Sequence, residues 1–316
     1  MKFQATEQLR TAAARLARLA PEQPLVPMLA CAVFRCGHGQ SSDNSVTLNI
    51  PVDVGGAEFA VNAVRLSAAL SVAGPEAELS LGEAQLTIKG GRFTARIELL
   101  DTHAFPWTDM PTASRLPAGD IIKAIQAVSP FASGNGWSSV VALSGSRAMA
   151  SDGASLLITA PGVPDIDCSL PAKAAQIAVL LSGDANEINI DDHALTFFSP
   201  DGSWLRASLV STEWPNVSSL IPDPSALPSA PLGLWDAVSQ VVVFGDGPVC
   251  LAGNLVSRDS AEIAIDFALP NCAFLADVLL VVAGVSSHID LTKYPRCPFG
   301  NPMSGVAGSI SGVRHA

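Results

Sequence analysis

The chain has 316 residues, of which 48% are hydrophobic and 15% are charged, and its formal net charge is -11. This apolar content over this length excludes a disordered chain and is sufficient for two or three compact domains. The net negative charge excludes nucleic-acid binding by bulk attraction, so any contact with DNA must come from locally placed basic residues.

The first residues, MKFQATEQLR, have no long apolar core of the kind that a signal peptide needs. No stretch reaches the roughly 18 apolar residues that suggest a membrane span, so we expect a soluble cytoplasmic protein. The cysteines, at positions 31, 36, 168, 250, 272 and 297, form no C-x-x-C pair and no Cys/His cluster with zinc spacing. We expect reduced and mostly buried thiols.

Two helical patterns recur along the chain. The first occupies residues 6–20, 117–132 and 231–244. The second follows the end of an apolar strand, at residues 59–70, 168–181 and 267–280. If Val61, Leu170 and Leu269 are equivalent positions, the offsets between the copies are 109 and 99 residues. This periodicity predicts one unit written three times, each reading helix, strands, helix, strands.

Strand patterns follow the second helix of the first two copies. Residues 77–100 and 186–210 alternate apolar and polar side chains around a GG and a PDG turn. Both copies close with an aromatic-proline step, Phe105-Pro106 and Trp214-Pro215. The matching half of the third copy, residues 286–316, is short and interrupted by prolines and glycines, so we expect it to lack a strand or to form an irregular hairpin.

Proline-containing stretches at 111–117 and 221–231 separate the copies, as linkers between compact domains often do. We therefore predict an α+β fold with domains at 1–115, 116–226 and 227–316, the third being shortened. Each domain is expected to pack two helices on antiparallel sheets.

Local sequences then point to a family. They are PLVPMLACAVF at 24–34, ELLDTHAFPWTDMP at 98–111, ASDGASLL at 150–157, STEWPNVSSLIP at 211–222 and NCAFLADVL at 271–279. In this order they resemble segments of the bacterial sliding clamps, the β subunit of DNA polymerase III, along essentially the whole chain. The resemblance implies three tandem clamp domains, two chains closed into a ring around duplex DNA, no catalysis and no cofactor.

The first helix shows how DNA could be accommodated. At 100° per residue, an apolar stripe (Leu9, Ala13, Leu16, Ala20) lies opposite an arginine trio (Arg10, Arg15, Arg18). The other basic candidates for facing DNA are Arg65, Lys123 and Lys173.

Two departures from the family weaken this interface. The helices of the third domain carry no Lys or Arg, and Gln23 stands where some members of the family carry a DNA-contacting arginine. We expect feeble DNA binding by the chain without a loader.

The resemblance also implies an apolar pocket between the second and third domains, which accepts short linear peptides from polymerases, loader subunits and repair proteins. Carried over by motif, its walls are Trp137, Ser151, Asp152, Gly153, Leu156, Pro215, Leu220, Ile310, Val313 and Arg314. Ala154 and Ser155 replace the His-Arg of the family, and SGVRHA replaces a Met-Pro-Met-Arg ending, so the peptide preference stays open.

Signals for catalysis are weak. Histidines at 38, 103, 193, 288 and 315 are scattered without metal-ligand spacing, and the glycine clusters lack the context of a phosphate-binding loop. No Gly-x-Ser-x-Gly elbow occurs, and the carboxylate pairs Asp191-Asp192 and Asp165/Asp167 have no acid/base partner nearby in sequence. We predict no catalytic residue, no metal site and no cofactor.

Three hypotheses remain at this stage. The first is a processivity clamp, a homodimeric ring associated with the nucleoid, that binds double-stranded DNA without sequence preference and binds polymerase and loader through peptides. The second is a clamp-derived interaction scaffold that has lost efficient DNA encirclement. The third is an unrelated binding protein built of three β-rich units. The sequence leaves a dimeric or a trimeric ring open.

Overall fold

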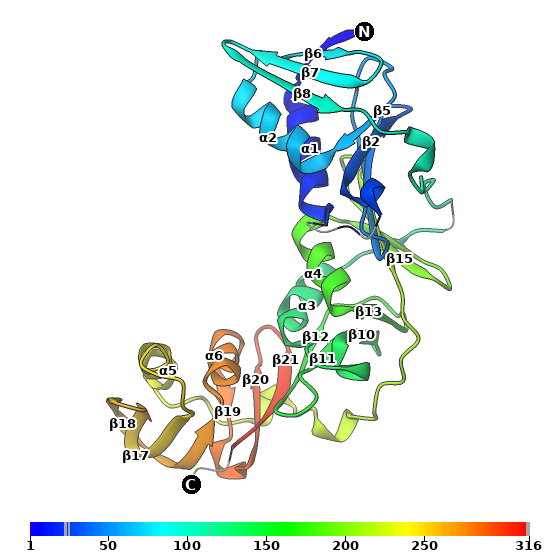
Figure 1. Cartoon of the computed structure of the whole chain (residues 1–316). Helices are drawn as coiled ribbons and strands as arrows, with labels where there is room; N and C mark the ends of the chain where they lie inside the picture. The colour runs from blue at the N-terminus through cyan, green and yellow to red at the C-terminus, as the bar shows by residue number, and fades with distance from the viewer. Residues whose placement is uncertain (22–23, 25, 113, 314–316) are drawn as a thin grey trace. The chain divides into compact units, whose positions relative to one another are not determined.

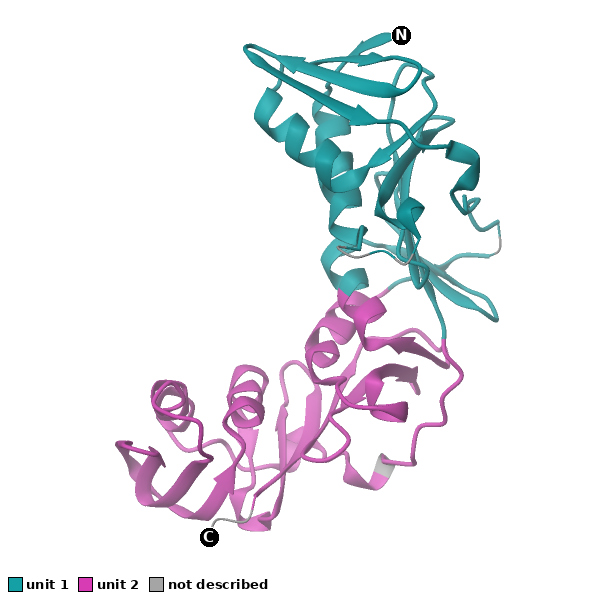
Figure 2. Cartoon of the chain, viewed as in Figure 1, with its two compact units in different colours: residues 1–118, 177–209 teal, residues 119–176, 210–316 magenta. Residues whose placement is uncertain are grey.

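The computed structural model describes residues 1–316 apart from 22–23, 25, 113 and 314–316 (Figure 1). The chain divides into two compact units, Met1–Ala118 with Ile177–Leu209 and Gly119–Gln176 with Val210–Ala316 (Figure 2). Each unit is built around one long antiparallel sheet to which two of the predicted repeats contribute strands. The second repeat contributes to both units.

The first helix, α1 (Glu7–Leu19), forms where the sequence predicts it. The Thr6 hydroxyl accepts a hydrogen bond from the Leu9 amide at 3.1 Å and caps the helix. Leu9, Ala13 and Leu16 are fully buried, so the predicted apolar stripe faces the core. Each such leucine contributes roughly 1.5–3 kcal/mol of burial free energy.

The second helix of the first repeat, α2 (Ala63–Ala73), lies beside α1 (Figure 1). The Asn62 side chain accepts a hydrogen bond from the Arg65 amide at 2.9 Å, and the helix ends at Gly74, whose φ of +80° suits glycine. The remaining helices are α3 (Ile121–Val128), α4 (Ala172–Leu181), α5 (Leu234–Val241) and α6 (Ala276–Val285).

The sheet of the first unit runs β5-β2-β3-β4-β16-β15-β14-β9. Its strands are β2 (Cys31–Arg35), β3 (His38–Ser42), β4 (Val46–Pro51), β5 (Phe59–Asn62), β9 (Leu116–Pro117), β14 (Glu187–Ile190), β15 (Ala194–Phe198) and β16 (Trp204–Ser208). Pairing of β4 with β16 joins the first repeat to the second, and it places the fully buried Leu48 opposite Leu205.

A smaller sheet in the same unit runs β1-β6-β7-β8. Its strands are β1 (Lys2–Gln4), β6 (Glu78–Leu81), β7 (Gln85–Gly90) and β8 (Phe93–Glu98). Among the described residues β8 pairs on one side only, so one edge of this sheet is open.

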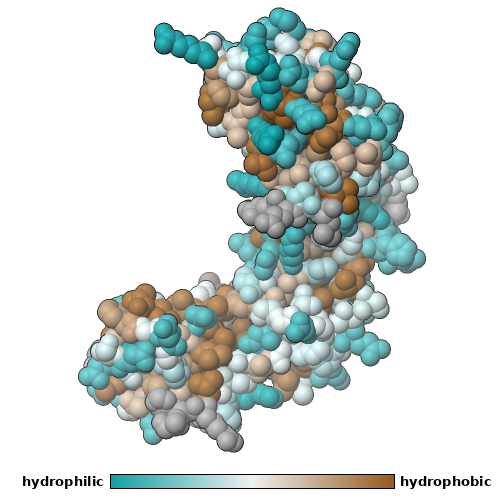
Figure 3. All heavy atoms as spheres, in the orientation of Figure 1, coloured by the Kyte–Doolittle hydropathy of each residue, from teal (hydrophilic) through white to brown (hydrophobic). Residues whose placement is uncertain are grey.

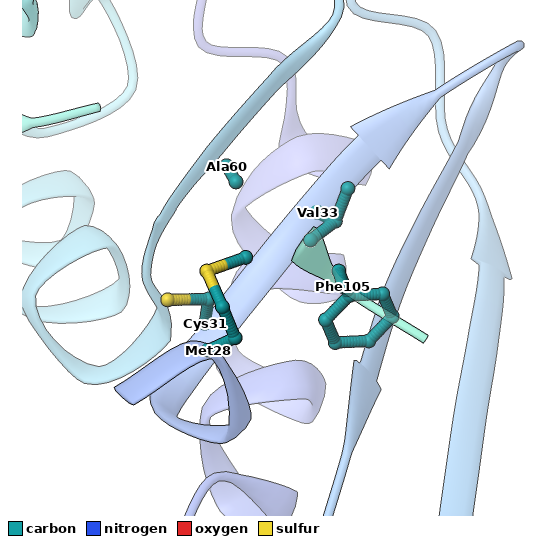
Figure 4. Close-up of a cluster of buried hydrophobic side chains, with 5 residues drawn as sticks. All are labelled: Met28, Cys31, Val33, Ala60 and Phe105. Carbon is teal, nitrogen blue, oxygen red and sulfur yellow. The ribbon is translucent and has the colours of Figure 1, made fainter. Parts of the chain in front are cut away.

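The aromatic-proline step after β8 is part of the core. Phe105 is 4% exposed and packs with Met28, Cys31, Val33 and Ala60 (Figure 4). This contact holds the segment that leaves β8 against the sheet. In the other unit the second aromatic-proline step packs on an aromatic ring: the rings of Trp214 and Trp137 meet edge to face with centroids 5.2 Å apart.

The sheet of the second unit runs β13-β10-β11-β12-β21-β20-β19. Its strands are β10 (Val140–Ser144), β11 (Arg147–Ser151), β12 (Leu156–Pro161), β13 (Cys168–Pro171), β19 (His288–Ile289), β20 (Arg296–Asn301) and β21 (Val306–Ser311). Here β12 pairs with β21, so the second repeat meets the third through the same strand pairing that joins the first to the second.

The third repeat is shortened at a different place from the one that the sequence predicts. Its second half keeps β19, β20 and β21, so the predicted loss of a strand there is wrong. The shortening lies between α5 and α6, where the described residues form β17 (Val249–Arg258) and β18 (Ala261–Phe274), while the other repeats have four strands between their helices. The two long strands pair with each other, with a register shift at Gly253, and leave the outer edge of β17 open.

Arg258 holds this ribbon to α5. The side chain is 8% exposed, and its guanidinium donates hydrogen bonds to the carbonyl oxygens of Gly247, at 2.8 Å, and of Val242. A basic residue of the third repeat is therefore used for packing within that repeat.

Arg15 links the first repeat to the second. Its guanidinium contacts the Asp201 carboxylate at 3.1 Å and donates to the Leu181 carbonyl at 2.9 Å and to the Ser203 hydroxyl at 3.2 Å. Burial alone raises the pKa of Asp201, but hydrogen bonds from Ser203 and the charge of Arg15 outweigh burial and hold that pKa below its usual range. Deprotonated Asp201 therefore stabilises the first unit.

We expect Asp201→Asn to lower the free energy of unfolding at pH 7 by about 1 kcal/mol, because half-exposed ion pairs contribute modestly. A carboxyl with a lowered pKa contributes fully above its unfolded pKa and loses the contribution as pH falls through its folded pKa. Urea unfolding at pH 7 and at pH 3 should therefore show a gap between wild type and variant that shrinks in acid. Asp192→Asn, at an exposed position of the β14–β15 turn, is the control. An equal gap at both pH values would contradict this role.

Candidate functional site

The predicted peptide-binding segment folds into a tight loop between β11 and β12. One carboxylate oxygen of Asp152 accepts hydrogen bonds from the amides of Ala154, Ser155 and Leu156, at 2.9, 2.7 and 2.9 Å. The Ser151 hydroxyl accepts a further one from the Gly153 amide at 3.0 Å. The loop backbone is therefore fixed before any partner binds.

A cavity of about 150 Å³ opens beside this loop. Five of the predicted wall residues line it together: Trp137, Ser151, Gly153, Leu156 and Leu220. Its volume lies below the roughly 300 Å³ at which small-molecule pockets begin, so it suits one anchoring side chain rather than a whole ligand.

The other predicted wall residues lie elsewhere. Asp152 organises the loop, and Pro215 is exposed without lining the cavity. Ile310 is fully buried opposite Leu156 in the sheet. The Val313 amide donates to the Ala273 carbonyl at 2.8 Å, which packs the tail onto β18. Arg314 lies outside the described residues.

Several lining residues were not predicted, among them Leu157, Val217, Arg296, Ser309 and Ser311. Arg296 is exposed and sits opposite Ser311 in the β20–β21 pair. It places a positive charge at the rim of an otherwise neutral cavity wall. Strand pairing between residues 296–301 and 306–311, around the NPMSG turn, was the signal in the sequence that would have brought Arg296 to this site.

The arginine trio on α1 divides into different environments. Arg15 is bound to Asp201, Leu181 and Ser203, as described above. Arg10 is half-buried and lies 3.6 Å from the Glu7 carboxylate. Arg18 and, on α2, Arg65 are exposed. The two exposed arginines are therefore better placed to meet phosphates than the two that are held by neighbours.

The two lysines predicted to face DNA in the second repeat are exposed on its helices. Lys123 lies 2.7 Å from the Asp120 carboxylate, and this hydrogen bond and the charge of Asp120 raise the pKa of Lys123. Lys173 is exposed on the first turn of α4. Gln23, the proposed departure near Pro24, lies outside the described residues.

The helices of the third repeat present a different surface. Hydrophobic residues gather over α5 and α6 (Figure 3). Val243, Phe244 and Leu280 are 74%, 57% and 39% exposed. The charged residues on the two helices are Asp236 and Asp277, so this face is apolar and weakly acidic.

The described part of the chain holds no group of three or more His, Cys, Asp or Glu side chains that could bind a metal ion. Burial raises the pKa of Cys31 to about 11, and burial with the nearby charge of Asp167 raises the pKa of Cys168 to about 12. These thiols stay protonated at neutral pH. None of the described helices is long and apolar enough to cross a membrane.

Comparison with known proteins identifies the architecture. The sequence matches no family model and no curated protein. The structure matches the DNA polymerase sliding clamp of Pseudomonas aeruginosa at 16% identity and a TM-score of 0.78, over 100% of this chain and 99% of that one. It matches Caulobacter crescentus pol III beta at 16% and 0.79, over 99% of both chains, and the Thermotoga maritima DNA polymerase III beta subunit at 16% and 0.78, over 100% of both.

The chain therefore has the sliding-clamp fold along its whole length, an α+β architecture of three tandem clamp domains. The fold predicted from the sequence resemblance is confirmed. The domain boundaries near 115 and 226 stay a prediction.

We expect Asp152→Ala to loosen the loop, because the half-buried amides of Ser155 and Leu156 lose their shared acceptor, and each unmet buried group costs about 1–3 kcal/mol. Hydrogen exchange followed by mass spectrometry should show lost protection in residues 151–157 while the β14–β16 strands keep theirs. Asp165→Ala, at an exposed position between β12 and β13, is the matched control. Unchanged protection in 151–157 would show that Asp152 does not hold the loop.

Proposed function

We propose that this chain is a DNA sliding clamp, a protein without catalytic activity that encircles duplex DNA and tethers a DNA polymerase for processive synthesis. The observation that carries the proposal is the match over the full length of both chains to structures described as sliding clamps. We infer a cytoplasmic location, with the nucleoid. A clamp must enclose DNA without reading its sequence, so it needs charge that faces phosphates and no contact that holds base edges.

The charge distribution favours weak electrostatic contact with DNA. Arg18, Arg65, Lys123 and Lys173 are exposed on helices of the first two repeats. The third repeat offers an apolar helix face in the corresponding position, as described above. Retention on DNA would then come mainly from closure of the ring, and loading would depend on a dedicated loader.

We propose that two copies close a ring by a junction like those that join the repeats within the chain. Within the chain, the fourth strand of a repeat pairs with the last strand of the next, β4 with β16 and β12 with β21. A head-to-tail ring repeats this junction between the third repeat of one copy and β8 of the other. Because the described residues of the third repeat have no counterpart of β4, we propose that β8 pairs with the open edge of β17 instead.

The cavity beside the 151–156 loop is proposed to receive peptides of the polymerase and the clamp loader. A single apolar side chain would occupy it, next to Leu220, and a peptide carboxylate would pair with Arg296. Substitution of the family His-Arg by Ala154 and Ser155 leaves fewer polar groups in the loop, so anchoring would depend more on apolar contact.

A second candidate function has its own support. The third repeat lacks two strands at the proposed closing junction, and its helices expose apolar side chains instead of cations. Both features fit a clamp-derived scaffold that binds peptides without encircling DNA.

Retention on circular DNA separates the two functions. We expect the chain, loaded onto a nicked plasmid with a clamp loader, to co-migrate with the circle through gel filtration at moderate salt and to dissociate when the plasmid is cut, because a closed ring slides off an end. Release at the same rate from circular and linear DNA would contradict encirclement and favour the scaffold.

The exposed arginines should set the salt dependence of direct DNA binding. Arg18→Ala and Arg65→Ala are each expected to lower the slope of log affinity against log salt by about 0.9, the value for one lost phosphate contact. Fluorescence anisotropy with a labelled duplex measures this slope. Lys293→Ala, at an exposed position of a short turn in the second unit, provides the control. Slopes that stay at the wild-type value would remove both arginines from the DNA-facing set.

A further inference from the structure

The first unit contains a second cavity at the equivalent place in the fold. It encloses about 560 Å³ at the β4–β16 junction, and its walls include Asn49 on β4 and Trp204 on β16. These two residues are directly paired across the junction. The cavity beside the 151–156 loop lies at the β12–β21 junction. We refer to the larger one as the first-junction pocket.

Both cavities are built from the same parts of the repeat. In each, one wall is a sheet junction and the opposing wall is the segment that follows an aromatic-proline step. After Phe105-Pro106 this segment supplies Trp107 and Met110, and after Trp214-Pro215 it supplies Val217 and Leu220. The repeat that gives the chain one partner pocket therefore gives it a second.

The wall of the first-junction pocket is held rigidly. The buried Gln40 side chain donates to the Thr108 carbonyl at 2.6 Å and accepts from the Thr108 amide at 3.0 Å. Gln40 also donates to the Asn49 side chain at 3.2 Å, and Asn49 lies 2.9 Å from a ring nitrogen of His38. Phe105, immediately before, is fixed in the core (Figure 4). A wall fixed in advance reduces the ordering cost of binding.

The chemistry of the pocket selects its ligand. Trp107 and Met110 offer indole and thioether surfaces, which accept apolar or aromatic side chains, and Trp204, at 3% exposure, is part of the wall beneath. Arg35 and Asp109 are the lining residues of opposite charge; Arg35 has 41% of its side chain exposed, and its ion pair with Glu58 is long, at 3.9 Å. A ligand carboxylate can replace Glu58 at low cost, because exposed pairs are weak.

We propose that the first-junction pocket is a second peptide-binding site, which takes a linear segment of a partner protein with an apolar or aromatic anchor next to an acidic residue. The anchor lies against Trp107 and Met110, and the carboxylate pairs with Arg35. The volume, within the range of ligand pockets, accommodates more of a peptide than the 150 Å³ cavity of the second unit. The inference stands whether or not the chain encircles DNA.

Selection from a phage-displayed library of random dodecapeptides tests it. The full chain is the target, and the chain with Met110→Glu is used for counter-selection. Met110 is 52% exposed, so a glutamate there places charge in the pocket without disturbing the core. We expect enriched peptides to share an apolar or aromatic residue adjacent to Asp or Glu.

Synthetic peptides from the selection are then measured by fluorescence anisotropy. Arg35→Glu and Met110→Glu are each expected to weaken binding at least about tenfold, the effect of losing a central contact. Arg296→Ala, in the cavity of the second unit, should leave binding unchanged. Three results would overturn the proposal. The first is a selection in which no peptide is enriched on the full chain relative to the Met110→Glu chain, and the second is enriched peptides that lack the acidic residue. The third is peptides whose affinity falls with Arg296→Ala and not with Met110→Glu.

Discussion

The fold depends on one interaction, the antiparallel pairing of a strand from one repeat with the last strand of the next. A sheet edge exposes unpaired amides and carbonyls, which must find partners in the chain, in solvent or in another molecule. Pairing of β4 with β16 and of β12 with β21 satisfies two such edges and turns three similar repeats into two continuous sheets. Both cavities that we assign to peptides lie at these junctions, so the pairing that builds the fold also builds the sites.

The need to pair strand edges also bears on the third repeat. Its two long strands replace the four found in the other repeats, and the pairing pattern of the described residues leaves the edges of β8 and β17 open. An open edge is a template for another chain, and here both edges belong to one protein. Assembly of copies is thus the simplest way in which the pattern inside the chain can be completed.

Much of the fold could be predicted from the sequence, because local patterns and repetition carry it. Helices, hairpins and aromatic-proline steps lie where the periodicity placed them. The position of the missing strands was also predictable. The spacing between equivalent positions is 109 residues from Val61 to Leu170 but 99 residues from Leu170 to Leu269. Leu269 precedes α6, so this difference places the lost residues in the first half of the third repeat. The prolines and glycines in 286–316 predict a missing strand in the second half of the repeat. That prediction is wrong, because β20 and β21 accommodate these residues.

The sites were less predictable, because they depend on pairs that are distant in sequence. A helical wheel places Arg15 with Arg10 and Arg18, but only the tertiary structure shows that Asp201 and Leu181 hold it. Arg296 reaches the loop cavity through strand pairing across the second and third repeats, and Trp204 reaches the first-junction pocket through pairing with Asn49. Motifs read along the sequence do not predict these contacts, because the partners are far apart in the chain.

Sedimentation velocity of the purified chain, measured over a wide concentration range, tests the central claim most directly, because a clamp must assemble to enclose DNA. The account predicts one species of twice the 32.6 kDa monomer mass that persists on dilution through the micromolar range. A monomer at every concentration, or a series of open-ended oligomers, would contradict a self-closing ring and leave the interaction scaffold as the better description.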